Sequence, residues 1–337
     1  MRWVGGRLTF IVATSGLVIG FNNYYRYPIY MYTGGGFMFL FPYFLGMMIF
    51  GFPLLLLELT VGQMYQRSGV GVMRAIHPRL IGVGISKVYA ALILASYYFY
   101  LCGLAAFYLA ESFRDPLKWS TEDFQFKCVP IPAVQYYVMD VQKIMNSSCQ
   151  YLQPGDISDV NWWLFFATAV IWCLVYGMVF KGAKSISYTV WVTVIVPTVL
   201  LFILLIGGST IDGANEGLKL YARNEKNYDH TGEFESNAYW SDAFDFIYAT
   251  LYSSTGLLIV YGSYNKRDKP VILDSFVIWL FNCLFSFISG LALFMLVGYL
   301  REKNNPAAST NFLSSSLSFA FTVIPTGALG LEGENFW

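Results

Sequence analysis

The sequence predicts an all-α protein that crosses a membrane several times. Of its 337 residues, 56% are apolar, 19% are aromatic and only 12% are charged. Several uncharged runs approach the roughly 20 residues that a helix needs to cross the hydrocarbon core of a bilayer. A soluble domain would not tolerate such runs, so the lipid bilayer is the expected surrounding of this chain.

Seven membrane-spanning segments are predicted from these runs. In chain order they cover residues 8–30, 37–61, 88–110, 162–180, 186–207, 243–262 and 271–299. The first begins with the uncharged stretch LTFIVATSGLVIGF and continues into a polar motif instead of a small-residue cleavage site, so it is not interpreted as a signal peptide.

The distribution of charge predicts a cytoplasmic amino terminus, because cytoplasmic segments of membrane proteins collect Lys and Arg. With that placement the inner loops hold a single acid, Asp268, whereas the outer segments hold twice as many acidic as basic residues. The inner basic residues are Arg2, Arg7, Arg67, Arg74, Arg79, Lys87, Lys181, Lys184, Lys266, Arg267 and Lys269. We expect a multi-pass plasma-membrane protein; a seven-helix receptor of the G-protein-coupled kind would need the opposite orientation.

Composition and motifs also argue against other classes of protein. The 21 basic and 21 acidic residues cancel, so nothing indicates a nucleic-acid partner. The two histidines, His77 and His230, fall on opposite predicted sides of the membrane, and no Cys/His cluster has zinc spacing. The sequence has no Walker loop for ATP-driven transport, and we predict neither enzyme chemistry nor an organic cofactor.

The predicted outer loop at residues 114–161 contains Cys128, Cys149 and the sequon NSS at Asn146. A disulfide and a glycan both suit the extracellular side, and two free thiols with an unused sequon are the alternative. The cysteines within predicted spans are interpreted as packing residues: Cys102, Cys173 and Cys283.

Two predicted spans carry polar interruptions. GFNNYYRYP at residues 20–28 interrupts the first, and SSTG at residues 253–256 interrupts the sixth. A helix in hydrocarbon can unwind only where protein or a lined cavity satisfies its backbone. Interruptions at matching places of two five-helix repeats indicate a secondary-transporter site. A packing kink is the alternative for the first.

Asn23, Thr250 and Asn282 offer side-chain oxygens at the depth of these interruptions. Sodium prefers a cage of oxygens, and the carbonyl groups of unwound helices can complete one. The same three side chains can instead form hydrogen bonds that hold the helices together. The residues alone leave both interpretations open.

Several stretches together resemble the neurotransmitter:sodium symporter family. They are GFNNYYRYP, GGGFMFLFPYFLGMMIFGFPLLLLELTVGQ, SYYFY, WSDAFDFIYAT, YGSYNK and NCLFSFISGLALFMLVGYL. The resemblance implies the leucine-transporter-like inverted-repeat helix bundle, two five-helix repeats within about twelve helices. Residues 1–207 would form the first repeat. Residues 208–337 would hold an extracellular loop, spans six and seven and an outer loop helix.

The resemblance implies sodium- and chloride-coupled symport of a small amino acid or amino-acid-like zwitterion. One sodium would be held by the carbonyl group of Val18 and by the side chains of Asn23, Thr250 and Asn282. A second would take the carbonyls of Gly16 and Ile19, with its other ligands on span eight.

The chloride ligands implied by the resemblance are Tyr43, Thr250, Asn282 and Ser286. Ser286 is informative because relatives that do without chloride tend to carry a carboxylate there. Phe246 stands where a chloride-contacting glutamine is usual, so this set is incomplete. Ordinary packing within the spans is the alternative role of Tyr43 and Ser286.

The substrate carboxylate would meet the break in the first span and the third span, at Gly20, Phe21, Asn22 and Tyr98. Gly20 stands where monoamine carriers have an aspartate, which points to a substrate with its own carboxylate. Arg26 would be the cation of an outer gate; its alternative role is a structural arginine that snorkels to the outer interface.

Some residues depart from the family pattern around this pocket. Asn22 replaces a glycine, Ala249 replaces a gating phenylalanine, and Leu17 and Tyr252 are bulky for a lined cavity. The sequence ends at GENFW, where an eighth span would begin. The further spans would also have held the acidic partner expected for Arg26. We therefore keep two hypotheses: the amino-terminal part of a symporter, or a transport-inactive membrane subunit that assembles with another membrane protein.

Overall fold

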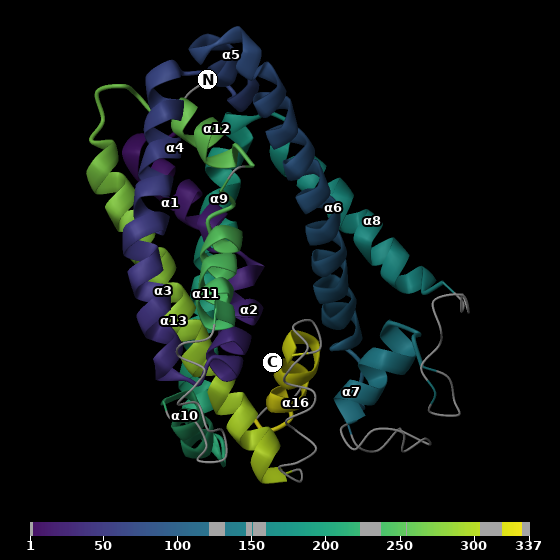
Figure 1. The fold of residues 1–337 in the computed structure, drawn as a ribbon. Helices are drawn as coiled ribbons and strands as arrows, with labels where there is room; N and C mark the ends of the chain where they lie inside the picture. Colours follow the sequence, from purple (N-terminus) through teal and green to yellow (C-terminus); the bar gives the residue numbers. More distant parts are fainter. Residues whose placement is uncertain are drawn as a thin grey trace.

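The computed structural model describes residues 3–120, 132–145, 150, 160–222, 237–253, 255–303 and 319–331. The regular elements within these ranges are helices, as the sequence predicts (Figure 1). Cys128, Cys149 and Asn146 lie outside the described residues, so the disulfide and the glycan remain predictions.

Five of the seven predicted spans are helices long and apolar enough to cross a membrane. They are α3, η1 and α4 in succession (Phe37–Gly46, Met47–Gly51, Phe52–Tyr65), α6 (Ile81–Glu111), α8 (Trp162–Val179), α9 (Ala183–Ser209) and α13 (Val271–Lys303). The short 3-10 helix η2 (Pro78–Leu80) leads into α6, which therefore begins before the predicted residue 88. These predicted spans are confirmed.

The other two predicted spans are each broken into two helices. The first consists of α1 (Gly6–Val18) and α2 (Phe21–Thr33), and the sixth of α11 (Asn237–Thr250) and α12 (Leu257–Ser263). Gly20 is extended, and its N–H donates to the side chain of Asn23, so that Asn23 caps α2. Gly256 begins α12 at a φ of 75°, a left-handed conformation that glycine adopts without strain.

Shorter helices lie at the two ends of the spans. α5 (Gly69–Ile76) is at the same end as the amino terminus, whereas α7, α10 and α16 lie toward the other end (Figure 1). The remaining short elements are α7 (Pro132–Tyr136), η3 (Tyr137–Val141), α10 (Ala214–Ala222), η5 (Phe319–Val323) and α16 (Ile324–Ala328). α10 supplies regular structure in the extracellular loop that is predicted to begin at residue 208.

α13 is the central helix of the main bundle, because it contacts α1, α2, α4, α9 and α10. α12 packs closely on α4, where Gly62 faces the backbone of Ile259 and Gly262 faces the backbone of Leu59. A side chain at either glycine would overlap the opposite backbone. These small residues let the second half of the broken sixth span lie against the second span.

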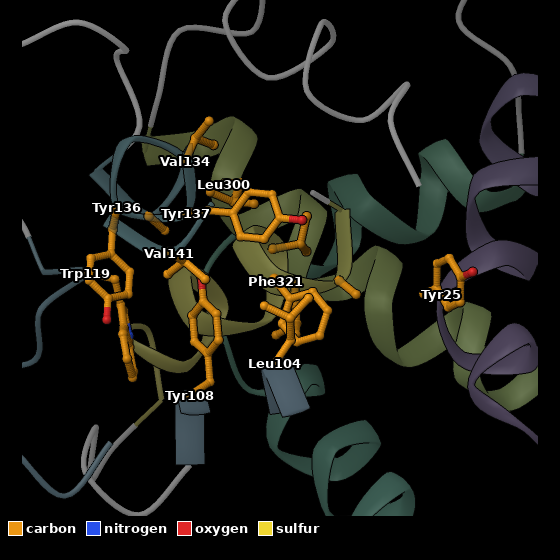
Figure 2. Packing of buried hydrophobic residues seen from close by; sticks show 14 of the residues in the cluster. Tyr25, Leu104, Tyr108, Trp119, Val134, Tyr136, Tyr137, Val141, Leu300 and Phe321 are labelled. Atoms are coloured by element: carbon orange, nitrogen blue, oxygen red, sulfur yellow. The ribbon is translucent and has the colours of Figure 1, made fainter. Parts of the chain in front are cut away.

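Figure 2 shows a cluster of aromatic and aliphatic side chains, which lies toward the end of the molecule opposite the amino terminus (Figure 1). Tyr108 at the end of α6 packs against Trp119, Tyr136 and Phe321, and the ring of Tyr137 stacks on that of Phe321. The cluster buries apolar surface shared by α6, α7, η3, η5 and the end of α13. It fixes these elements relative to one another.

The outer surfaces of α6, α8 and α9 are apolar. Trp162, Trp163 and Phe166 of α8 are exposed, and no residue of this helix is buried. A surface of this kind is unfavourable in water and favourable against lipid tails. The exposure pattern agrees with a protein embedded in a bilayer.

Two ion pairs join helices near the end that carries the amino terminus. Arg7 Nε lies 2.7 Å from the Asp274 carboxylate, whose side chain is fully buried. Lys87 Nζ lies 3.3 Å from Glu58 Oε1, and both side chains are largely buried. Lys87, which the sequence assigns to an inner loop, therefore lies within α6 and binds the second span.

Candidate functional site

The two helix breaks bring three predicted sodium ligands into one buried cluster. Thr250 Oγ1 donates to Asn23 Oδ1 at 2.7 Å, and it lies 3.4 Å from Asn282 Oδ1 and 3.3 Å from the carbonyl oxygen of Val18. Asn23 Nδ2 donates to Asn282 Oδ1 at 2.5 Å. All three side chains and Val18 are 0% exposed, so these hydrogen bonds form away from solvent.

Local structure explains how these residues reach one place. Val18 is the last residue of α1, Thr250 is the last residue of α11, and Asn23 is in the first turn of α2. Asn282 lies on α13, which passes both breaks. The carboxyl ends of α1 and α11, which carry the negative ends of the helix dipoles, therefore face the cluster.

Serines of α13 extend the cluster. Asn23 Nδ2 also donates to Ser286 Oγ at 2.9 Å, and Ser289 Oγ donates to the carbonyl oxygen of Asn23 at 2.6 Å. Sequence analysis missed Ser289, although Asn282, Ser286 and Ser289 recur at intervals of four and three residues. That spacing places them on one face of a helix and is the signal that could have found Ser289.

The donor set fits a small cation beside an anion. Four oxygens that can face a cation come from Val18, Asn23, Thr250 and Asn282, and none of their side chains carries a formal charge. Among the predicted sodium and chloride ligands, the buried donors Tyr43 Oη and Asn282 Nδ2 have no hydrogen-bond partner in the described part of the chain. Unpaired buried donors are costly, and an anion such as chloride would satisfy them.

Phe246 fills the position next to Tyr43 where the resemblance implies a glutamine. The two ring centroids are 5.6 Å apart, and both side chains are 0% exposed. An aromatic ring offers no amide donor, so the donors predicted for chloride are the hydroxyl groups and the Asn282 amide.

The residues predicted for a second sodium, Gly16 and Ile19, line a cavity of about 650 Å³. Most of its other lining residues are apolar and come from α9, including Val194, Pro197 and Leu201. This cavity lies beside the first break and supplies few polar groups. Among the described residues that line this cavity, no other predicted sodium ligand lies beside the Gly16 and Ile19 carbonyl groups.

The predicted substrate residues separate into two pairs. Gly20 and Phe21 line the same cavity, whereas Asn22 and Tyr98 do not. Asn22 Nδ2 donates to the carbonyl oxygen of Ala249 at 3.1 Å, which joins the two broken spans. The Tyr98 hydroxyl accepts a hydrogen bond of 2.5 Å from Tyr252.

The partner of Arg26 differs from the expectation. The sequence placed this partner in spans beyond the end of the chain, but Arg26 Nη2 lies 3.1 Å from Asp245 Oδ2 on α11. Tyr30 also donates to the same oxygen at 2.6 Å. α2 and α11 lie side by side and bring together residues 219 positions apart, which no local pattern in the sequence indicates.

The fold and this cluster define a class of protein: a helical membrane protein whose two broken spans meet at a buried polar site, as in secondary transporters. The sodium:neurotransmitter symporter family model matches residues 2–337. The chain belongs to this family, whose members are transporters and not enzymes. The predicted leucine-transporter-like fold class is confirmed.

Curated relatives agree with this assignment. The sodium-dependent serotonin transporter of Drosophila melanogaster is 28% identical over 99% of this chain and 54% of its own length. The human sodium- and chloride-dependent neutral and basic amino acid transporter B(0+) is 29% identical, over 97% and 57% respectively. The creatine transporter of Torpedo marmorata is 29% identical, over 98% and 55%. The chain thus spans a little over half the length of these relatives.

Proposed function

We propose that this chain is part of a sodium-coupled symporter of the plasma membrane that takes up a small amino acid or amino-acid-like zwitterion. The observation that carries the proposal is the fully buried cluster of Asn23, Thr250 and Asn282 at the two helix breaks. The names of the relatives support sodium dependence, and two of them, for serotonin and creatine, show that substrates vary within the family.

A neutral cluster of oxygens suits sodium transport because the ion must bind and leave. The carboxyl ends of α1 and α11 add negative partial charge without a permanent counter-ion. The amino end of α2, at Phe21 and Asn22, offers backbone N–H groups and positive partial charge to an anionic substrate group. The ion and the substrate would share the break at Gly20, so binding of one favours binding of the other.

Chloride would bind beside the sodium, at Tyr43, Thr250, Asn282 and Ser286. The two unpartnered donors, Tyr43 Oη and Asn282 Nδ2, support this part of the proposal. Chloride would balance the positive charge that sodium brings into a cluster with no carboxylate. The B(0+) relatives carry chloride dependence in their names.

We further infer that residues 1–207 form the first repeat, with a cytoplasmic amino terminus. The broken first and sixth spans support a five-helix repeat, since Thr250 at the second break is hydrogen-bonded to Val18 and Asn23 at the first. The basic residues of the predicted inner segments support the orientation.

The proposal is tested by the sodium dependence of thermal stability and of uptake. Sodium, compared with potassium, should raise the melting temperature of the purified protein. Asn23→Ala and Asn282→Ala should move this effect and uptake to higher sodium concentration. Thr14→Ala is the matched control, because Thr14 is equally buried but donates only to Phe10 of its own helix. If both alanine variants keep the wild-type dependence of stability and uptake on sodium concentration, these asparagines serve only as hydrogen bonds between helices.

The alternative function is a transport-inactive membrane subunit. The hydrogen bond from Asn22 to the Ala249 carbonyl oxygen favours the subunit, because the protein itself uses this backbone acceptor at the proposed substrate site. Stable insertion without any sodium effect on stability would support the subunit.

A further inference from the structure

Tyr252 lies in the break between α11 and α12 in an unusual conformation. Its φ is 49°, in the left-handed region that side chains other than glycine rarely adopt. Such a residue persists only where the surrounding structure stabilises it, and it is found most often at functional sites. The side chain is 7% exposed, so packing and not solvent determines where it points.

The Tyr252 hydroxyl is held between the first and third spans. It donates to Tyr98 Oη at 2.5 Å, and the two rings are 5.8 Å apart between centroids. It also lies against Gly20: a Cβ at Gly20 would overlap Tyr252 Oη, whereas Tyr252 Cζ would be 3.3 Å away. Only glycine at this position leaves room for the hydroxyl.

We propose that Tyr252 is a specificity-determining residue whose hydroxyl occupies the position of the substrate carboxylate. This inference rests on the proposed function, which assigns that position to Gly20 and the amino end of α2, and the family resemblance adds Tyr98. The Tyr252 hydroxyl oxygen already forms the hydrogen bond to Tyr98 that a substrate carboxylate would form. An α-amino acid can enter this end of the site only when Tyr252 has left it.

The arrangement sets the size of the effect. A carboxylate must replace the Tyr252–Tyr98 bond and displace the ring from Gly20 before it gains its own contacts. The apparent affinity falls by the fraction of molecules in which Tyr252 has moved. For one buried hydrogen bond this factor is about tenfold. The site of the wild-type protein therefore disfavours simple amino acids such as glycine, and removal of the phenol should admit them.

A double-mutant cycle tests the position of the hydroxyl without any ligand. Gly20→Ala should lower the melting temperature in the presence of Tyr252, and lower it less when Tyr252→Phe has removed the overlapping oxygen. Gly16→Ala is the matched control, because its Cβ would overlap Val194 and not Tyr252. Its effect should be the same in both backgrounds. An equal Gly20→Ala penalty in both backgrounds, or failure of this variant to fold in both, overturns the inference.

Glycine binding in sodium then tests the consequence for the substrate. Tyr252→Ser should bind radiolabelled glycine about tenfold more tightly than the wild type does. If Tyr252→Ser keeps the sodium effect on melting temperature but binds glycine no better, the inference is wrong and the proposed function stands. If sodium fails to stabilise the wild type, the proposed function fails, and the assignment of this position to a substrate fails with it.

Discussion

Replacement of Asn23 by aspartate should convert the buried cluster into a charged site that depends on sodium. The Asn23 side chain donates two hydrogen bonds, to Asn282 and Ser286, and accepts two, from Thr250 and the Gly20 N–H. Asn23→Asp keeps the shape and both accepted bonds. It loses both donated bonds and places a negative charge where the side chain is 0% exposed.

The expected magnitude follows from these contacts. A buried charge without a partner lowers the free energy of unfolding by about 3–5 kcal/mol, and this is the loss that we expect in potassium. In sodium the carboxylate becomes an additional ligand of the cation. A tenfold gain in sodium affinity adds about 1.4 kcal/mol of stabilisation at saturating ion. The difference between sodium and potassium should therefore be larger in the variant than in the wild type.

Thermal unfolding followed by tryptophan fluorescence, in matched sodium and potassium buffers, measures both effects. Asn161→Asp is a suitable control, because Asn161 caps α8 through a bond to the Leu164 N–H that aspartate can also accept. Its difference in stability between sodium and potassium should equal that of the wild type. If Asn23→Asp loses the same stability in sodium as in potassium, no cation reaches the cluster and the ion-site argument is wrong.

Three further predictions concern charged residues outside the cluster. Arg7→Ala should lower the free energy of unfolding by about 3–5 kcal/mol, because it leaves the fully buried Asp274 carboxylate without its arginine. The double variant Arg7→Ala with Asp274→Asn should recover most of this loss. If the double variant is as unstable as Arg7→Ala alone, the unpaired charge is not the cause. Asp245→Asn should lower the free energy of unfolding by less than about 1 kcal/mol, because the ion pair of Asp245 with Arg26 is partly exposed. This loss should vanish in about 1 M salt, which screens exposed charges. A loss that salt does not change would contradict a screened ion pair. Arg267→Cys should react with a membrane-impermeant thiol reagent only from the cytoplasm, and labelling from outside would reverse the proposed orientation.

Sequence determined the spans because the thickness of a bilayer acts on every segment separately. A run of about 20 apolar residues is favourable in hydrocarbon whatever its neighbours are, so five continuous spans could be located. The two breaks were also predictable. Glycine and polar residues are unfavourable in a continuous helix in hydrocarbon, so their presence within an apolar run predicts an interruption of the helix. The structure has helix ends at Val18 and Thr250, close to both predicted interruptions.

The composition of the candidate site was predictable only in part. Asn23, Thr250 and Asn282 were expected together because the family resemblance relates them, and the structure brings them within hydrogen-bond distance. Ser289 was missed although its spacing from Asn282 places it on the same helix face. Its partner is a backbone carbonyl group, which leaves no mark in the sequence.

Only the tertiary structure decided which side chains meet across the breaks. Asp245 pairs with Arg26, and Tyr252 reaches both Tyr98 and Gly20. Each contact depends on how two helices lie side by side and on the direction of the chain at one residue. A backbone rotation at Tyr252 would carry its hydroxyl away from the site without changing any apolar run. Hydrophobic pattern determines where a helix lies in the membrane, whereas packing between helices determines what a side chain touches.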